Sequence, residues 1–91
     1  MVKTIKILIS GRVQGVFFRD FVKQQADKLN IKGFSRNIAD NFLEIIAQGD
    51  EKSLKKLISK VKTGPKFAKV DKIDVSAETS DEVFNEFKIL Y

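Results

Sequence analysis

The chain has 91 residues, with no cysteine and no histidine, and its 17 basic and 12 acidic residues leave a net charge of +5. This composition excludes disulfides, thiolate nucleophiles, imidazole bases and the common zinc sites. The length predicts one domain over residues 1–91. The sequence shows no signal peptide or membrane-spanning run, so we expect a cytoplasmic protein.

The first half of the chain predicts a strand, a helix and a second strand. Residues 3–10 alternate between apolar and polar side chains, which is typical of a half-buried strand. Gly11 and Gly15 then break this period. Apolar side chains at helical spacing predict a helix over about 18–29, and residues 31–38 are predicted to form the second strand.

A turn, a third strand and a second helix follow. Asp40-Asn41 is a turn signal, because both residue types tolerate positive φ. Residues 43–48 alternate and predict a strand, after which Asp50 is placed to cap a helix. The i, i+3, i+4, i+7 spacing of apolar residues predicts that helix over about 51–62.

Gly64-Pro65 ends the second helix, and two further strands are predicted, one around 73–77 and one at 87–91 that includes Tyr91. The element order is βαββαβ with an extra short strand. It predicts an α+β ferredoxin-like sandwich, with two helices on one face of a mostly antiparallel sheet of four or five strands. Because this fold serves many functions, the function must be argued from a site.

Residues 11–19 are the strongest candidate for such a site. A glycine-rich turn leaves a strand and opens a helix, where backbone N–H groups and the helix dipole favour an anion. Arg19 falls in the first helical turn, and its planar guanidinium matches phosphate oxygens. The segment has neither Walker nor dinucleotide-binding spacing. Its spacing alone is also that of an ordinary strand-to-helix turn.

Two blocks of sequence resemble the signatures of the acylphosphatase family. The first is Gly-Arg-Val-Gln-Gly-Val-Phe-Phe-Arg at residues 11–19. The second is Gly-Phe-Ser-Arg-Asn at residues 33–37, followed by Glu44 and Gly49. Gly64-Pro65 also matches in position, so the resemblance covers nearly the whole chain. The chain departs from the family pattern at three positions. Asn41 stands where the family usually has glycine, and Ser35 and Leu43 stand where valine or a similar residue is common.

The resemblance implies that the protein hydrolyses small acyl phosphates without a metal or other cofactor. It implies that Arg19 and the backbone amides of the loop bind the phosphoryl group, and that Asn37 positions the attacking water. The loop residues concerned are Gln14, Gly15, Val16, Phe17 and Phe18. We expect the side chains of Arg12 and Gln14 to point to solvent and Arg36 to flank the site. Inorganic phosphate would be both product and inhibitor, and we expect a monomer that binds neither nucleic acid nor membranes.

Three other functions are compatible with the predicted fold. An RNA-recognition module shares the element order, but after Lys32-Gly33-Phe34 the RNA-binding motif fails at Ser35 and Arg36. A ligand-sensing regulatory domain would not need both Arg19 and Asn37 in these contexts. A copper-chaperone-like domain is untenable without cysteine.

Overall fold

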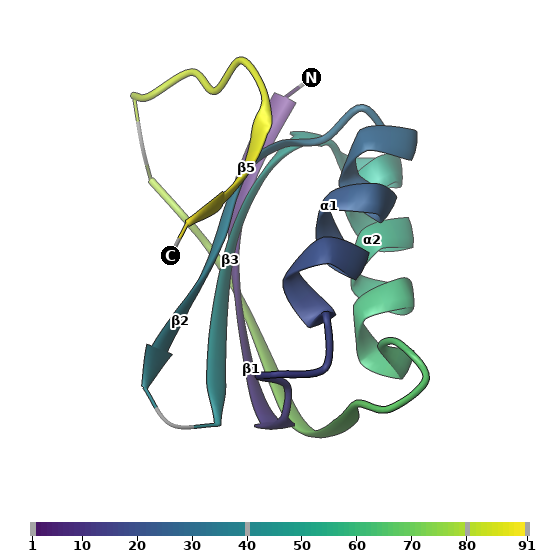
Figure 1. Ribbon diagram of the computed structural model, residues 1–91. Coiled ribbons are helices and arrows are strands. Elements are labelled where there is room, and N and C mark those ends of the chain that lie inside the picture. The colour runs from purple at the N-terminus through teal and green to yellow at the C-terminus, as the bar shows by residue number, and fades with distance from the viewer. Residues whose placement is uncertain (1, 40, 80, 91) are drawn as a thin grey trace.

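The computed structural model describes residues 2–39, 41–79 and 81–90. Five strands and two helices form two layers (Figure 1). In chain order they are β1 (Val2–Arg12), α1 (Phe18–Lys28), β2 (Lys32–Ala39), β3 (Phe42–Asp50), α2 (Glu51–Thr63), β4 (Lys69–Ala77) and β5 (Phe87–Leu90). The predicted Asp40 and Tyr91 lie outside the described residues.

The sheet has the strand order β4-β1-β3-β2-β5. β1 and β3 form the antiparallel centre, β4 pairs with β1 and β2 pairs with β3, both antiparallel, and β5 runs parallel to β2. Both helices cover one face of this mixed sheet (Figure 1). The predicted ferredoxin-like arrangement is therefore confirmed, with the last strand forming an edge beside β2.

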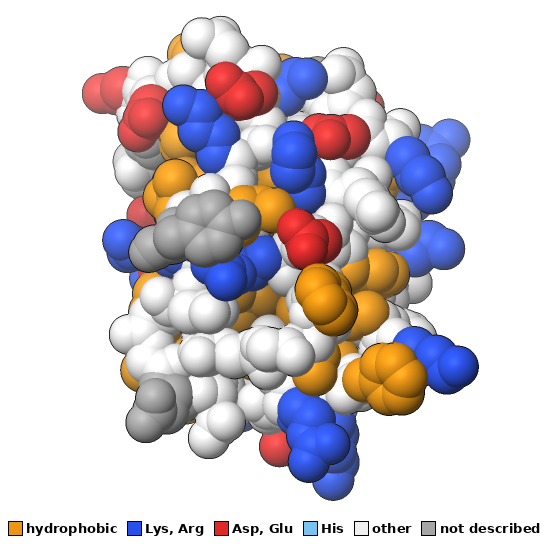
Figure 2. Space-filling view, viewed as in Figure 1, with side chains coloured by type: hydrophobic (Ala, Val, Ile, Leu, Met, Phe, Trp, Pro, Cys, Tyr) orange, Lys and Arg blue, Asp and Glu red, His pale blue; other side chains and the backbone are white. Residues whose placement is uncertain are grey.

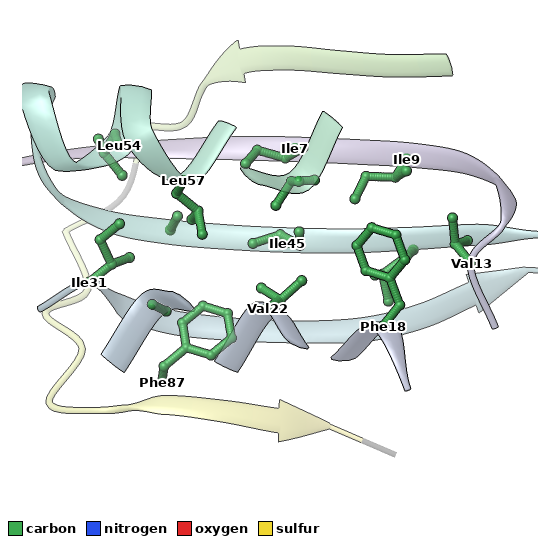
Figure 3. Packing of buried hydrophobic residues seen from close by; sticks show 14 residues of the cluster. Ile7, Ile9, Val13, Phe18, Val22, Ile31, Ile45, Leu54, Leu57 and Phe87 are labelled. Carbon is green, nitrogen blue, oxygen red and sulfur yellow. The ribbon is translucent and has the colours of Figure 1, made fainter. Parts of the chain in front are cut away.

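The hydrophobic core lies between the helices and the sheet. Alternation puts every second residue of β1 and β3 on the helix side, and each helix turns an apolar stripe toward them (Figure 3). The buried core residues from these four elements are Ile7, Ile9, Phe18, Val22, Ala26, Leu43, Ile45, Ala47, Leu54, Leu57 and Val61. One polar side chain, Ser35 of β2, is also fully buried, and its hydroxyl has no hydrogen-bond partner among the described residues.

The opposite side of the sheet, which we call the open face, is crossed by the described residues between β4 and β5, 78–79 and 81–86 (Figure 1). Gln48 of β3 holds this segment against the sheet through two hydrogen bonds. Its Nε2 donates to the Glu82 carbonyl at 2.9 Å, and its Oε1 accepts from the Phe84 amide at 3.0 Å. The Phe84 ring also packs edge-on against Phe34, with 5.9 Å between ring centroids. The segment therefore occupies part of the open face.

Candidate active site

The loop between β1 and α1 has an unusual backbone. Gly15 has a φ of 72° and Phe17 a φ of 60°, so two residues of the loop are left-handed. A Cβ at Gly15 would meet nothing within 4 Å, so glycine is required there by its φ and not by lack of space. For Phe17 the left-handed conformation costs about 1–2 kcal/mol. Backbones that alternate in this way turn successive N–H groups toward a common point and form anion-binding concavities.

The N-terminus of α1 has no side-chain cap. Phe17 occupies the N-cap position and makes no side-chain hydrogen bond, while its carbonyl accepts the first helical bond from Phe21 at 3.0 Å. The first amides of a helix have no partner inside the helix and carry its positive dipole end. This junction is therefore open to an anionic ligand.

A hollow of about 360 Å³ lies at this junction. Its lining residues are Val13, Gln14, Gly15, Phe17, Phe18, Arg19, Asp20 and Ile89. Four of the five predicted loop residues thus line it together with Arg19. The exception is Val16, whose partly buried side chain packs against the core. Sequence reasoning missed three lining residues. Val13 precedes the predicted loop residues, Asp20 lies in the first turn of α1, and Ile89 comes from β5 at the far end of the chain.

Arg19 is held against the last strand of the sheet. Its side chain is half-buried, and Nη1 donates to the Leu90 carbonyl at 2.9 Å. This bond joins residues 71 positions apart in the sequence. It fixes the guanidinium at the hollow, so the fold brings the predicted arginine and the predicted loop together.

Gln14 ties the loop to the β2–β3 hairpin. Its Nε2 donates to the carbonyls of Ala39 and, at 3.0 Å, Phe42. The nearby Gly11 amide donates to the Asn41 carbonyl at 3.1 Å. The expectation that the Gln14 side chain points to solvent is therefore wrong, because its amide satisfies two hairpin carbonyls.

Asn37 lies on the helix side of β2, near the end of the strand. It pairs in register with the buried Leu43, and it shares a face with Ser35 by strand alternation. Its side chain is exposed, and among the described residues it is not one that lines the hollow. Ala39, two residues further on, accepts the Gln14 hydrogen bond, so the hairpin that carries Asn37 is joined directly to the loop.

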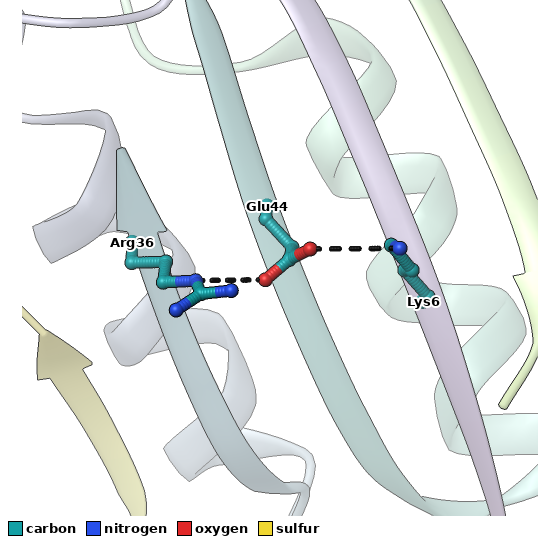
Figure 4. A network of polar contacts seen from close by, with 3 residues as sticks. All are labelled: Lys6, Arg36 and Glu44. Carbon is teal, nitrogen blue, oxygen red and sulfur yellow. Dashed lines mark hydrogen bonds and ion pairs between the residues drawn. The ribbon is translucent and has the colours of Figure 1, made fainter. Parts of the chain in front are cut away.

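The other two arginines lie elsewhere. Arg36 projects from the open face, where its Nε donates to Glu44 Oε1 at 2.9 Å, and Lys6 Nζ lies 3.6 Å from Glu44 Oε2 (Figure 4). The expectation that Arg36 flanks the site is wrong, because neighbouring residues of a strand point to opposite faces. Arg12 is exposed at the end of β1, and it is not one of the described residues that line the hollow.

The described residues bring no three His, Cys, Asp or Glu side chains together in a cluster that could hold a metal ion. Within the same residues, neither helix is long and apolar enough to cross a membrane.

The element order and the two-layer packing define a ferredoxin-like α+β domain, and the comparisons with known proteins narrow this to one family. The acylphosphatase family model matches residues 5–89. An acylphosphatase of Bacillus subtilis is 42% identical over 86 residues, which cover 94% of each chain. The chain belongs to the acylphosphatase family, whose members are enzymes.

Solved structures agree with this assignment. A crystal structure of acylphosphatase from Bacillus subtilis superimposes with a TM-score of 0.93 at 41% identity and covers 100% of both chains. An acylphosphatase from Coxiella burnetii gives a TM-score of 0.92 at 29% identity, covering 98% of this chain and 93% of that one. The relatives therefore match this chain in length as well as in fold.

Proposed function

We propose that the protein hydrolyses the carboxyl–phosphate bond of small acyl phosphates to a carboxylate and inorganic phosphate. The backbone amides of residues 14–18 and the guanidinium of Arg19 bind the phosphoryl group, and the Asn37 amide orients the attacking water. One observation carries this proposal. The uncapped N-terminus of α1 lies in a loop with two left-handed residues, and Arg19, one turn into the helix, lines the same hollow.

The chemistry of this reaction fits a chain without histidine or cysteine. Carboxylic acids have a pKa near 4, so the carboxylate leaves without being protonated and no general acid is needed. When the transition state is loose and metaphosphate-like, the attacking water also needs little help from a general base of the enzyme. What remains is positioning and stabilisation of charge on the phosphoryl oxygens, which amides and a guanidinium supply. A phosphoryl oxygen of the substrate accepts the proton of the water.

Arg19 and Asn37 have separable roles in this proposal. The guanidinium contacts the phosphoryl oxygens both in the bound substrate and in the transition state, and such an arginine contributes about 10³–10⁵ in rate. Asn37 acts on the water, and a single neutral donor contributes about 10²–10³. Because inorganic phosphate resembles the transferred group, it competes with the substrate for the loop and for Arg19 but does not need Asn37.

The remaining parts of the proposal concern the state of the protein. Residues 1–91 act as one cytoplasmic, monomeric domain without a metal or other cofactor. RNA is not a ligand, since the open face that RNA-recognition modules use is partly covered by residues 81–86 and its Arg36 is paired with Glu44. Titration with single-stranded RNA at moderate salt, and sedimentation of the free protein, check these two points.

The test is continuous spectrophotometry of benzoyl phosphate hydrolysis, with and without EDTA. Arg19→Ala is expected to abolish both turnover and inhibition by phosphate. Asn37→Ala is expected to lose about 10²–10³ in turnover but to keep inhibition by phosphate. Arg36→Ala is the matched control, because its guanidinium lies on the open face, and it should leave both quantities unchanged.

Two outcomes would contradict the proposal. If EDTA stopped the reaction, the metal-free mechanism would be wrong. If Asn37→Ala lost phosphate affinity as severely as Arg19→Ala, the assignment of Asn37 to the water would be wrong, although Arg19 and the loop could still bind the phosphoryl group.

A further inference from the structure

Two consecutive phenylalanines at the start of α1 have opposite environments. Phe18 is 1% exposed and packs in the core, with its ring edge-on to that of Phe21 at 6.0 Å. Phe17 is 78% exposed, although it also lines the hollow. A ring this exposed contributes little to the core, and the left-handed backbone at this position favours small or polar residues. The fold itself therefore gives no reason for an aromatic side chain at residue 17.

The place of Phe17 suggests a role toward the substrate. The phosphoryl group bound by the loop amides and Arg19 occupies the inner end of the hollow, so the acyl group attached to it must extend toward solvent past the rim. The Phe17 ring lines the hollow and is largely exposed, so it borders the path of the acyl group, and the half-buried Ile89 is another apolar residue of the lining. Hydrophobic side chains are gathered over the start of α1 on this face of the molecule (Figure 2).

We propose that the Phe17 ring is the contact surface for the acyl group and makes the enzyme selective for aromatic and bulky apolar acyl phosphates over acetyl phosphate. This inference rests on the proposed function and adds the class of substrate. An aromatic acyl group packs against the ring and removes apolar surface from water, whereas an acetyl group is too small to cover it. The ring therefore acts on the choice of substrate and not on the phosphoryl chemistry.

Phe67 offers a matched comparison within the chain. It is also a phenylalanine and is 71% exposed, but it is not among the described residues that line the hollow. Lys66 Nζ lies 5.5 Å from the centroid of its ring. If any exposed aromatic ring bound apolar acyl groups nonspecifically, Phe17 and Phe67 would have the same effect on the choice of substrate.

The experiment measures kcat/KM for benzoyl phosphate and for acetyl phosphate, and takes their ratio. Phe17→Ala is expected to lower this ratio about three- to tenfold. Any damage that the substitution does to the loop backbone lowers both rates together and cancels in the ratio. Phe17→Trp, which keeps an aromatic ring, should keep the ratio within about twofold of the wild type, as should Phe67→Ala.

The outcomes separate this inference from the proposed function. If Phe17→Ala leaves the ratio unchanged while the wild type turns over both substrates, the ring does not contact the acyl group and the inference fails alone. An equal change in Phe67→Ala would also overturn it. If the wild type hydrolyses neither acyl phosphate, the proposed function itself fails.

Discussion

The two helices of this protein begin at junctions that are built in opposite ways. At the start of α2, Asp50 has an extended backbone and its Oδ1 accepts the Ser53 amide at 2.6 Å. At the start of α1, Phe17 is left-handed and provides no side-chain cap. The β3–α2 junction carries its own anion on the positive end of the helix, whereas the β1–α1 junction leaves that place to a ligand. Within one sheet and one core, a single capping residue distinguishes the start of α2 from the helix start that we propose binds the phosphoryl group.

Placing a negative charge at the β1–α1 junction should have the largest effect on activity. Phe17→Asp puts a carboxylate at the N-terminus of α1, and aspartate tolerates the left-handed backbone. We expect acyl phosphate hydrolysis to fall about 10²-fold or more, because the carboxylate repels the phosphoryl group next to the amides that bind it. Phe17→Asn is the uncharged control and should lose much less activity. Equal losses in the two variants would show that charge at this junction is not the cause.

The position of the β1–α1 junction also depends on Gln14, whose side chain joins the loop to the β2–β3 hairpin. Gln14→Ala should lower kcat about tenfold and change inhibition by phosphate much less, because the loop shifts relative to the hairpin that carries Asn37. Gln48→Ala, which removes the hydrogen bonds to Glu82 and Phe84 on the open face, is the control. It should lower the melting temperature without changing kcat, and a similar fall of kcat in both variants would argue against a positioning role for Gln14.

Each helix has an acidic residue in its first turn, but the two have different surroundings. Asp20 lines the hollow, while Glu51 lies 3.2 Å from Lys3, which lowers the pKa of its carboxyl. Asp20→Asn should tighten inhibition by phosphate about two- to fivefold, since two exposed negative charges near each other repel by about 1 kcal/mol or less in water. Glu51→Gln should not change this inhibition. Added salt should reduce the effect of Asp20→Asn, and an effect that resists salt would contradict an electrostatic origin.

The smallest expected effect is the loss of stability when the Asp50 cap at the β3–α2 junction is removed. The hydrogen bond from the Ser53 amide lowers the pKa of Asp50, so the fold favours the charged form. This contribution is complete above the unfolded pKa of about 3.9 and is lost as the pH falls through the lower folded value. Asp50→Ala should melt several degrees lower near neutral pH, with unchanged activity, and the difference should shrink in acid. Asp50→Asn, which caps without titrating, should lose less at neutral pH.

The fold was predictable from local patterns. The starts of α1 and α2 fall on the predicted residues, and the cap of Asp50 is confirmed, because apolar period and capping chemistry act within a few residues. At the predicted turn, Asn41 has a φ of 66°, in agreement with the expectation for this residue type. Most ends of the elements moved by a residue or two, as at β2, which runs Lys32–Ala39. The exception is β4, which begins at Lys69, four residues before the predicted start.

The candidate site was predictable only in part. The loop and Arg19 come from one continuous segment, so their common place in the hollow follows from the chain itself. The contacts of Gln14 and the lining by Ile89 join residues that are distant in sequence, and no local pattern reports them. The direction of Arg36 was predictable, since a residue next to Asn37 in a strand must point to the other face.

The buried hydroxyl of Ser35, which has no hydrogen-bond partner in the described part of the chain, marks a position where a substitution should stabilise this enzyme. A buried polar group without a hydrogen bond costs about 1–3 kcal/mol, and this one lies in the middle of β2, where it pairs with Ile89 but is not itself among the described residues that line the hollow. Selection of random variants for survival at rising temperature should therefore favour replacement of Ser35 by alanine or valine early. Such a change would also let the chain tolerate later mutations at the β1–α1 junction that would otherwise unfold it.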